Sequence, residues 1–148
     1  MKVQNICRVD GQVYLRRYKI FKCRWFKIRL HHILLSDYDC LHDHPWNFIS
    51  IILKGGYFEK YSWLQHLEIR YGFIRRKLLF EDLDFVRKTW YGPFSFLYRR
   101  AEWKHALEIP EGKSCWSFVV MFKPRRKWGF WTKAGKWIFH KDYTPTQT

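Results

Sequence analysis

Three histidines have the residue type and the spacing of a metal site. His42 and His44 lie two residues apart, with Asp43 between them, and His105 follows much later in the chain. Successive side chains of an extended strand point to opposite faces, so His42 and His44 share one face and Asp43 points away from it. Two adjacent imidazoles supply part of a metal site, which a third imidazole from a distant strand would complete. An isolated His-x-His would instead favour inert polar residues at a strand end.

The residues around these histidines resemble the first motif of the cupin superfamily, in which His-x-His is followed by Glu and then by Gly. His42 and His44 fill the histidine positions, and Gly55 fills the glycine position. His105 alone matches the second cupin motif. The Pro, Gly and Asn positions of that motif carry Arg100, Glu102 and Ile109.

A more specific resemblance covers residues 12–140, nearly the whole chain. Residues 41–59, LHDHPWNFISIILKGGYFE, are similar to a family of small bacterial and phage cupins. Residues 98–101 and 125–130 resemble later segments of the same family, in the same order. The resemblance implies an all-β, single-domain cupin barrel, also called a jelly roll or double-stranded β-helix, with a bound metal. It implies no reaction, because that family has no settled one.

The chain departs from the cupin pattern at the carboxylate of the first motif, where Phe48 stands instead. A site of His42, His44 and His105 would therefore be a three-His site with positions open to water, substrate or dioxygen. Glu59 is the nearest candidate for a displaced fourth ligand, and a supporting role next to the ligands is the equal alternative. Imidazole suits several divalent metals, so Fe(II), Zn, Ni and Mn all remain candidates.

Two arginines and two aromatic residues are candidates for binding a substrate. Arg99 and Arg100 precede His105, and strand alternation should turn one of them, with Arg99 favoured, into the pocket. An arginine in that position would bind a carboxylate or phosphate through two parallel hydrogen bonds. Trp46 and Tyr57 are candidates for closing the pocket, although in a chain with 21% aromatic residues most aromatics must form the core.

Length and composition indicate one globular domain over residues 1–148, with a loose tail at 144–148. The chain has 148 residues, 47% of them hydrophobic, which is enough to bury a core. No apolar run approaches the roughly 20 residues of a membrane span, and the N-terminus lacks the apolar stretch of a signal peptide. Four cysteines without C-x-x-C spacing favour reduced thiols in a cytoplasmic protein, in a host cytoplasm if a phage encodes it.

The formal net charge of +15, combined with many aromatics, is also typical of a nucleic-acid-binding surface. The lysines and arginines are spread over the whole chain without a compact stripe, which favours a charge unrelated to nucleic acid. A small anionic substrate would explain a local cluster equally well.

Alternating apolar and polar residues recur along the chain, which predicts half-buried strands. Residues 12–18 are expected to form an edge strand, and residues 54–56 a hairpin-type turn. In residues 25–34, Phe26 and Ile28 face one way and Lys27 and Arg29 the other. Residues 78–88 have a weak helical period, inside an insertion at 60–92 that could cap the barrel. The predicted strands are residues 12–18, 25–34, 48–53, 57–63, 94–98, 105–109, 115–122, 127–132 and 136–140.

The leading functional hypothesis is a three-His metal enzyme that acts on a small anionic substrate. If the enzyme is redox-active, an Fe(II)-dependent oxygenase is the natural case. One alternative is a basic nucleic-acid-binding module on a cupin barrel whose metal is structural or absent. A sugar-nucleotide isomerase or epimerase ranks last, because the sequence lacks a clear acid/base pair for that reaction. The resemblance also makes a homodimer through edge strands plausible.

Overall fold

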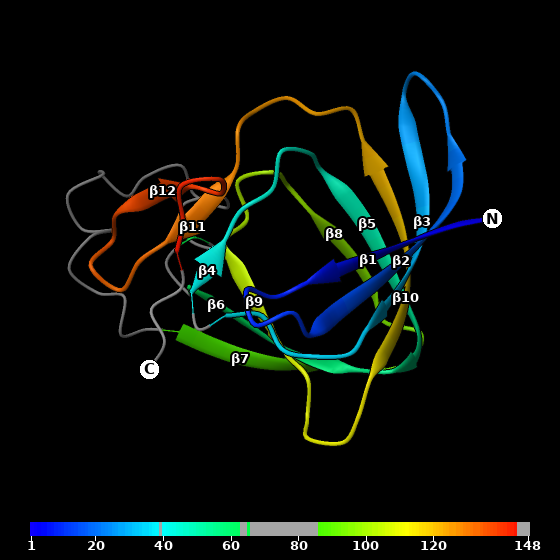
Figure 1. The fold of residues 1–148 in the computed structure, drawn as a ribbon, viewed down its shortest axis with the longest axis horizontal. Helices are drawn as coiled ribbons and strands as arrows, with labels where there is room; N and C mark the ends of the chain where they lie inside the picture. Colours follow the sequence, from blue (N-terminus) through cyan, green and yellow to red (C-terminus); the bar gives the residue numbers. More distant parts are fainter. Residues whose placement is uncertain (39, 63–64, 66–85, 145–148) are drawn as a thin grey trace.

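The structure is a computed structural model that describes residues 1–38, 40–62, 65 and 86–144. Within these residues the chain forms strands joined by turns and loops (Figure 1). This part of the chain contains no helix of the length and apolar character that crossing a membrane requires. The strands are β1 (Lys2–Cys7), β2 (Val13–Lys22), β3 (Phe26–Ile33), β4 (Leu41–His42), β5 (Phe48–Gly55), β6 (Tyr57–Ser62), β7 (Val86–Tyr91), β8 (Phe96–Arg99), β9 (His105–Glu108), β10 (Cys115–Phe122), β11 (Gly129–Trp131) and β12 (Trp137–Phe139).

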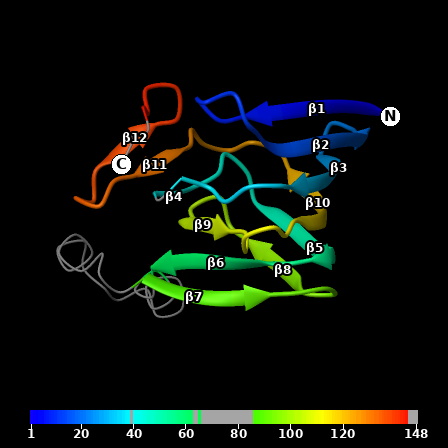
Figure 2. The ribbon, with the colours of Figure 1, turned by 60° about the horizontal axis from the view of Figure 1, so that its bottom comes forward.

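The strands form two antiparallel sheets of six strands each. One has the order β1-β2-β3-β10-β5-β8 and the other the order β12-β11-β4-β9-β6-β7. Figure 2 shows the first sheet on the right and the second on the left, each running from top to bottom in this order. Several neighbours in a sheet are distant in sequence, as where β10 pairs with both β3 and β5. This pair of antiparallel sheets is the all-β, cupin-type barrel that the resemblance implies.

All nine predicted strands exist, with boundaries shifted by a few residues, and three further strands were not predicted. β1 is the edge of its sheet, so the expectation that residues 12–18 form the edge was wrong. β4 has only two residues, too few to show an alternation. β7 includes residues 86–88 and therefore replaces the end of the expected helix, whose remaining residues 78–85 lie outside the described part of the chain.

Alternation along β10 shows how the core is built. Cys115, Ser117, Val119 and Met121 are buried, while the residues between them are more exposed. Ile52 of β5, which is fully buried, packs with Cys115 in the main hydrophobic cluster. Burying a side chain of this size contributes about 1.5–3 kcal/mol, so a few such residues hold the two sheets together.

The polar face of β3, not its apolar face, lies inside the barrel. Ile33 and Arg29 are buried, and His31 lies between them on the same side of the strand. Phe26 and Ile28 have the opposite parity and face outward. Alternation thus predicted the two faces of this strand correctly, but it could not show that the interior takes the basic face.

Gly55 and Gly56 carry the chain from one sheet to the other. β5 ends at Gly55 in the first sheet and β6 begins at Tyr57 in the second, so this segment is a corner and not a hairpin between paired strands. Gly55 has a positive φ of 73°, and a Cβ there would collide with the backbone carbonyl of Ser114. Only glycine fits this corner without strain.

Candidate metal centre

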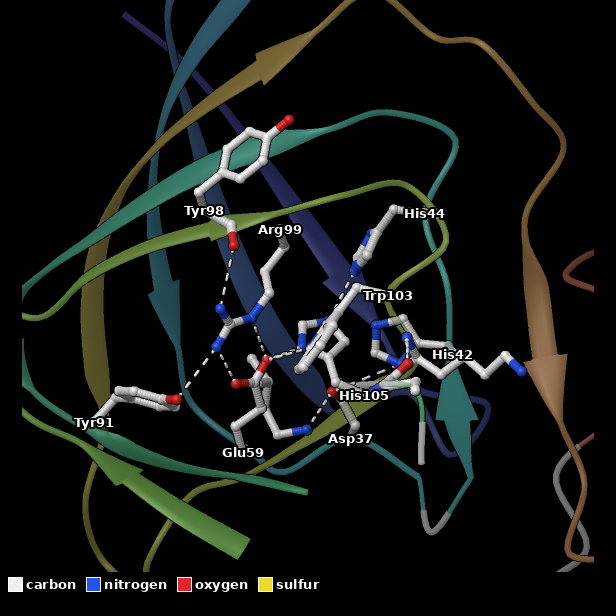
Figure 3. Close-up of polar contacts among 12 residues, drawn as sticks. Asp37, His42, His44, Glu59, Tyr91, Tyr98, Arg99, Trp103 and His105 are labelled. Carbon is white, nitrogen blue, oxygen red and sulfur yellow. Dashed lines mark hydrogen bonds and ion pairs between the residues drawn. The ribbon is translucent and has the colours of Figure 1, made fainter. Parts of the chain in front are cut away.

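Three histidines converge on one point of the barrel interior. His42 of β4 is the direct cross-strand partner of His105 of β9, and His44 follows two residues after His42. One nitrogen of each ring lies within 4.8 Å of those of the other two, a set of donors that could hold a metal ion. Figure 3 shows the three rings pointing toward one another, two from the segment of His42 and His44 and one from β9. The structure therefore brings together all three ligands that the sequence predicts.

The lowered pKa values of His42 and His44 suit a metal site. Burial lowers the pKa of His42 to about 4, although Asp37 opposes that shift. Burial also lowers the pKa of His44 well below its usual range, and His42 and His105 add to the effect. Nε2 of His44 lies 2.8 Å from Nε2 of His105. Neutral imidazoles are the metal-binding form, so the donor set fits a divalent transition metal.

Glu59 fixes the orientation of His105. Its Oε1 lies 2.6 Å from Nδ1 of His105, and it also accepts a hydrogen bond from Nε1 of Trp103 at 3.1 Å. Burial raises the pKa of Glu59, but hydrogen bonds from His105 and Arg99 outweigh it and lower the pKa to about 2. An ionised carboxylate only accepts, so Nδ1 of His105 carries the proton of this hydrogen bond, and its Nε2 is directed at the site.

Arg99 lies inside the barrel, but it binds Glu59 and does not line the cavity beside the histidines. Its Nε donates to Oε1 of Glu59 at 3.0 Å, its Nη2 lies 2.5 Å from Oε2, and its guanidinium lies 4.8 Å from the ring centre of Trp103. Burial by itself lowers the pKa of Arg99, and Glu59 reverses this and raises it. Arg100 is half-exposed and forms a 3.7 Å ion pair with Glu102 on the surface.

Asp37 approaches His42 from the loop after β3, and sequence reasoning missed it. Its Oδ2 accepts a hydrogen bond from the backbone N–H of Leu107 at 2.7 Å and lies 3.8 Å from Nδ1 of His42. That nitrogen is buried and has no hydrogen-bond partner among the described residues. Asp37 lies in an irregular segment, so no periodic pattern could have pointed to it.

Asp43 anchors the last two strands to the metal-binding segment. It is fully buried and points away from the site, as alternation predicts. Its Oδ1 accepts from the backbone N–H of Gly129 at 2.7 Å, and its Oδ2 accepts from the indoles of Trp131 and Trp137, both at 3.2 Å. Arg126 adds an ion pair at 3.1 Å. This one carboxylate joins the His-x-His segment to the distant Trp-Gly-Phe segment and the strand that follows it.

The three histidines line a cavity of about 130 Å³ between the sheets. Trp46 and Tyr57, the two predicted pocket aromatics, also line it, and Phe48 places its ring edge against His44 with the centroids 4.8 Å apart. A second cavity of about 400 Å³ shares three wall residues with the first, Tyr14, Asp37 and His42. The candidate metal centre therefore lies at the boundary between a small inner space and a larger outer one.

Two basic residues of the cavity wall were not predicted as site residues. Arg17 of β2 and His31 of β3 are cross-strand partners, and both line the 130 Å³ cavity. Nε of Arg17 donates to Nε2 of His31 at 3.3 Å. Their positions depend on which face of β2 and β3 lies inside, which the sequence pattern does not reveal.

No protein-family model and no curated protein matches this chain. Solved structures do match. The polyketide cyclase RemF from Streptomyces resistomycificus has a TM-score of 0.54 at 13% identity, over 76% of this chain and 68% of that one. Fe(II) HppE has a TM-score of 0.57 at 12% identity, and the DMSP lyase DddQ from Ruegeria pomeroyi DSS-3 has 0.54 at 12%. Both matches cover 82% of this chain but only 56% of the other. At such identities the likeness shows the fold alone.

Proposed function

We propose that this chain is a metal-dependent enzyme in which His42, His44 and His105 hold one divalent transition metal. The observation that carries the proposal is the convergence of three imidazoles on the wall of a cavity between the sheets. Glu59 supports it, because carboxylates that bind the second nitrogen of a ligating imidazole are a regular part of protein metal sites. We assign Glu59 this orienting role and not that of a fourth ligand.

Fe(II) is our first choice of metal, and a dioxygen-dependent reaction is our first choice of chemistry. The three protein ligands leave coordination positions free for other groups. When bound, iron would supply dioxygen chemistry, whereas zinc would polarise a substrate carbonyl or water. HppE, which has the same fold, was solved with Fe(II). The metal inventory of this chain decides between these chemistries.

The residues of the chain itself would bind the substrate, orient it and exclude water. The cavity of about 130 Å³ corresponds to the liquid volume of about four water molecules, which favours a small substrate or the head group of a larger one. Phe48, Trp46 and Tyr57 give that space apolar walls. We propose an anionic substrate, as the sequence suggested, but we assign Arg99 to holding Glu59 and give Arg100 no role at the site.

The first experiment is the metal content of protein purified without chelator or His-tag. We expect about one equivalent of a transition metal in the wild type and almost none in His42→Ala. His32→Ala is the matched control, because His32 lies on the outer face of β3, where it stacks on Trp116. Wild-type protein that stays metal-free after reconstitution with Fe(II), Zn, Ni and Mn would disprove the proposal.

Nucleic-acid binding and a sugar-nucleotide isomerase remain the alternatives. Affinity for single-stranded nucleic acid that falls steeply with salt, and that survives His42→Ala, would favour the first.

Homodimerisation is also proposed. Phe96 and Tyr98 expose their side chains on the edge strand β8, which would suit contact with a second copy. Sedimentation of Phe96→Ser against the wild type tests that contact.

A further inference from the structure

Arg17 is a partly buried cation, and none of the residues that the structure describes supplies a counter-ion for it. Its side chain lines the inner cavity, and burial lowers the pKa of its guanidinium, with the neighbouring Arg29 adding to this effect. Within the described part of the chain its recorded hydrogen bond is the one from Nε to His31, and none of the ion pairs there includes it. Its two terminal nitrogens therefore have no carboxylate partner among these described residues. A buried charge normally has one, because burying an unpaired charge is unfavourable.

The strands around Arg17 place further cations opposite one another. In the register of β2 with β3, Lys19 faces Arg29 and Lys22 faces Lys27. Like charges directly opposite in a sheet destabilise it, so this pairing does not serve stability. Lys27 places its ammonium group 5.9 Å from the ring centre of Trp46, which lines the inner cavity. A row of positive charge thus runs from the β2–β3 hairpin to the cavity.

Such an arrangement suits a negatively charged ligand. Cations that line one wall of a cleft raise the local concentration of anions and steer them inward. At the inner end of the row, the guanidinium fork of Arg17 matches the two oxygens of a carboxylate or of a phosphoryl group. The bond to His31 restrains the guanidinium, which lowers the entropy lost when it binds a ligand.

We propose that Arg17 is the anchor for the oxyanion of a small substrate, whose other end reaches the metal held by His42, His44 and His105. This inference deepens the proposed function and rests on it for the role of the metal. It does not rest on it for anion binding, which Arg17 would perform with or without metal. His31 is a positioning residue that holds the fork. The ligand class is a small carboxylate or phosphoryl compound.

The test measures anion binding by metal-free protein at low salt. Inorganic phosphate and acetate are titrated separately, and the Nε–H signals of the arginines are followed by NMR. We expect both anions to shift the signal of Arg17, with phosphate binding more tightly because more than one cation lines its path. Arg17→Gln should weaken phosphate binding about tenfold or more. Arg16→Gln is the matched control, because Arg16 is exposed on the opposite face of β2.

Two further measurements keep the test decisive. Arg17→Gln should unfold at the same temperature as the wild type or higher, because it removes an unpaired buried charge. Arg17→Lys keeps the charge without the fork and should bind phosphate with intermediate affinity. Unchanged phosphate affinity in a folded Arg17→Gln protein would overturn the inference, as would the absence of any shift at Arg17 with either anion. Metal binding without anion binding would reject only this inference, and anion binding without metal binding would reject only the proposed function.

Discussion

Nδ1 of His105 lies 2.6 Å from Oε1 of Glu59, and both side chains are almost completely buried. The same carboxylate accepts hydrogen bonds from the guanidinium of Arg99 and the indole of Trp103. Four groups thus form one network beneath the candidate metal centre. Because Glu59 holds the proton of His105 on Nδ1, Nε2 is left to face His44 at 2.8 Å. The geometry of the candidate metal centre therefore depends on Glu59, a residue outside the three-His cluster.

Glu59→Gln should weaken metal binding more than its position outside the ligand set suggests. The amide cannot hold the His105 proton as the carboxylate does, and losing such a partner typically lowers metal affinity about 10–100-fold. The variant also leaves Arg99 buried without a counter-charge, which costs roughly 3–5 kcal/mol. Competition titration with a chromogenic chelator measures the first effect, and urea unfolding measures the second.

A double variant separates these two effects. Glu59→Gln combined with Arg99→Met removes the uncompensated cation, so part of the lost stability should return while metal affinity stays low. Glu111→Gln, at an exposed turn, is the matched control and should change neither. Full recovery of metal affinity in the double variant would contradict the orienting role of Glu59.

Asp43→Asn should loosen the β11–β12 hairpin. Gly129, Trp131 and Trp137 all donate hydrogen bonds to this one carboxylate, and Arg126 forms an ion pair with it. An amide group would place a donor against some of these groups. Leaving buried donors without an acceptor costs about 1–3 kcal/mol each, so a loss of roughly 3 kcal/mol in urea unfolding is expected. Asp142→Asn, at an exposed position, should stay within about 0.5 kcal/mol of the wild type. Equal stability of the two variants would show that Asp43 does not anchor the hairpin.

The metal-free protein should lose stability as the pH falls below about 6.5. Burial lowers the pKa of His31 to about 3 and of His42 to about 4, and it lowers that of His44 well below the usual range. Between pH 6.5 and pH 4 the unfolded chain therefore binds protons that the folded chain excludes. Each such group removes up to about 1.4 kcal/mol per pH unit. Urea unfolding at several pH values should show a slope that becomes shallower in His42→Gln, and a flat profile would contradict the burial of neutral rings.

Gly55 and Gly112 both need a left-handed backbone conformation, but only Gly55 also lacks room for a side chain. Gly55 and Gly112 both have positive φ, 73° and 66°, but a Cβ at Gly55 meets the backbone of Ser114, whereas at Gly112 it meets nothing within 4 Å. Gly112→Ala should cost about 1–2 kcal/mol, the penalty of a left-handed L-residue. Gly55→Ala should cost roughly 2–5 kcal/mol, because the clash adds to that penalty. If thermal unfolding shows equal stability losses for Gly55→Ala and Gly112→Ala, the predicted steric clash at the corner between β5 and β6 is wrong.

Much of the fold and the three histidines could be predicted from the sequence because they are local patterns. Strand alternation depends only on neighbouring residues, so all nine predicted strands exist. The resemblance to cupins also pointed to His42, His44 and His105, and the structure brings their side chains together. Gly55 was expected at a turn, and its positive φ agrees. β4, with two residues, is too short for any periodic pattern.

The rest was decided by tertiary structure, because it depends on which faces the two sheets turn toward each other. Alternation divides β3 into an apolar and a basic face but does not show which face the barrel encloses. In the structure, the face with Arg29 and His31 lies inside the barrel. Pairing of β2 with β3 then brought Arg17 into the cavity. The same closure paired Arg99 with Glu59, whose positions are 40 residues apart and share no motif. The chain's own pattern thus predicts the three candidate metal ligands, whereas only the packed sheets determine what surrounds them.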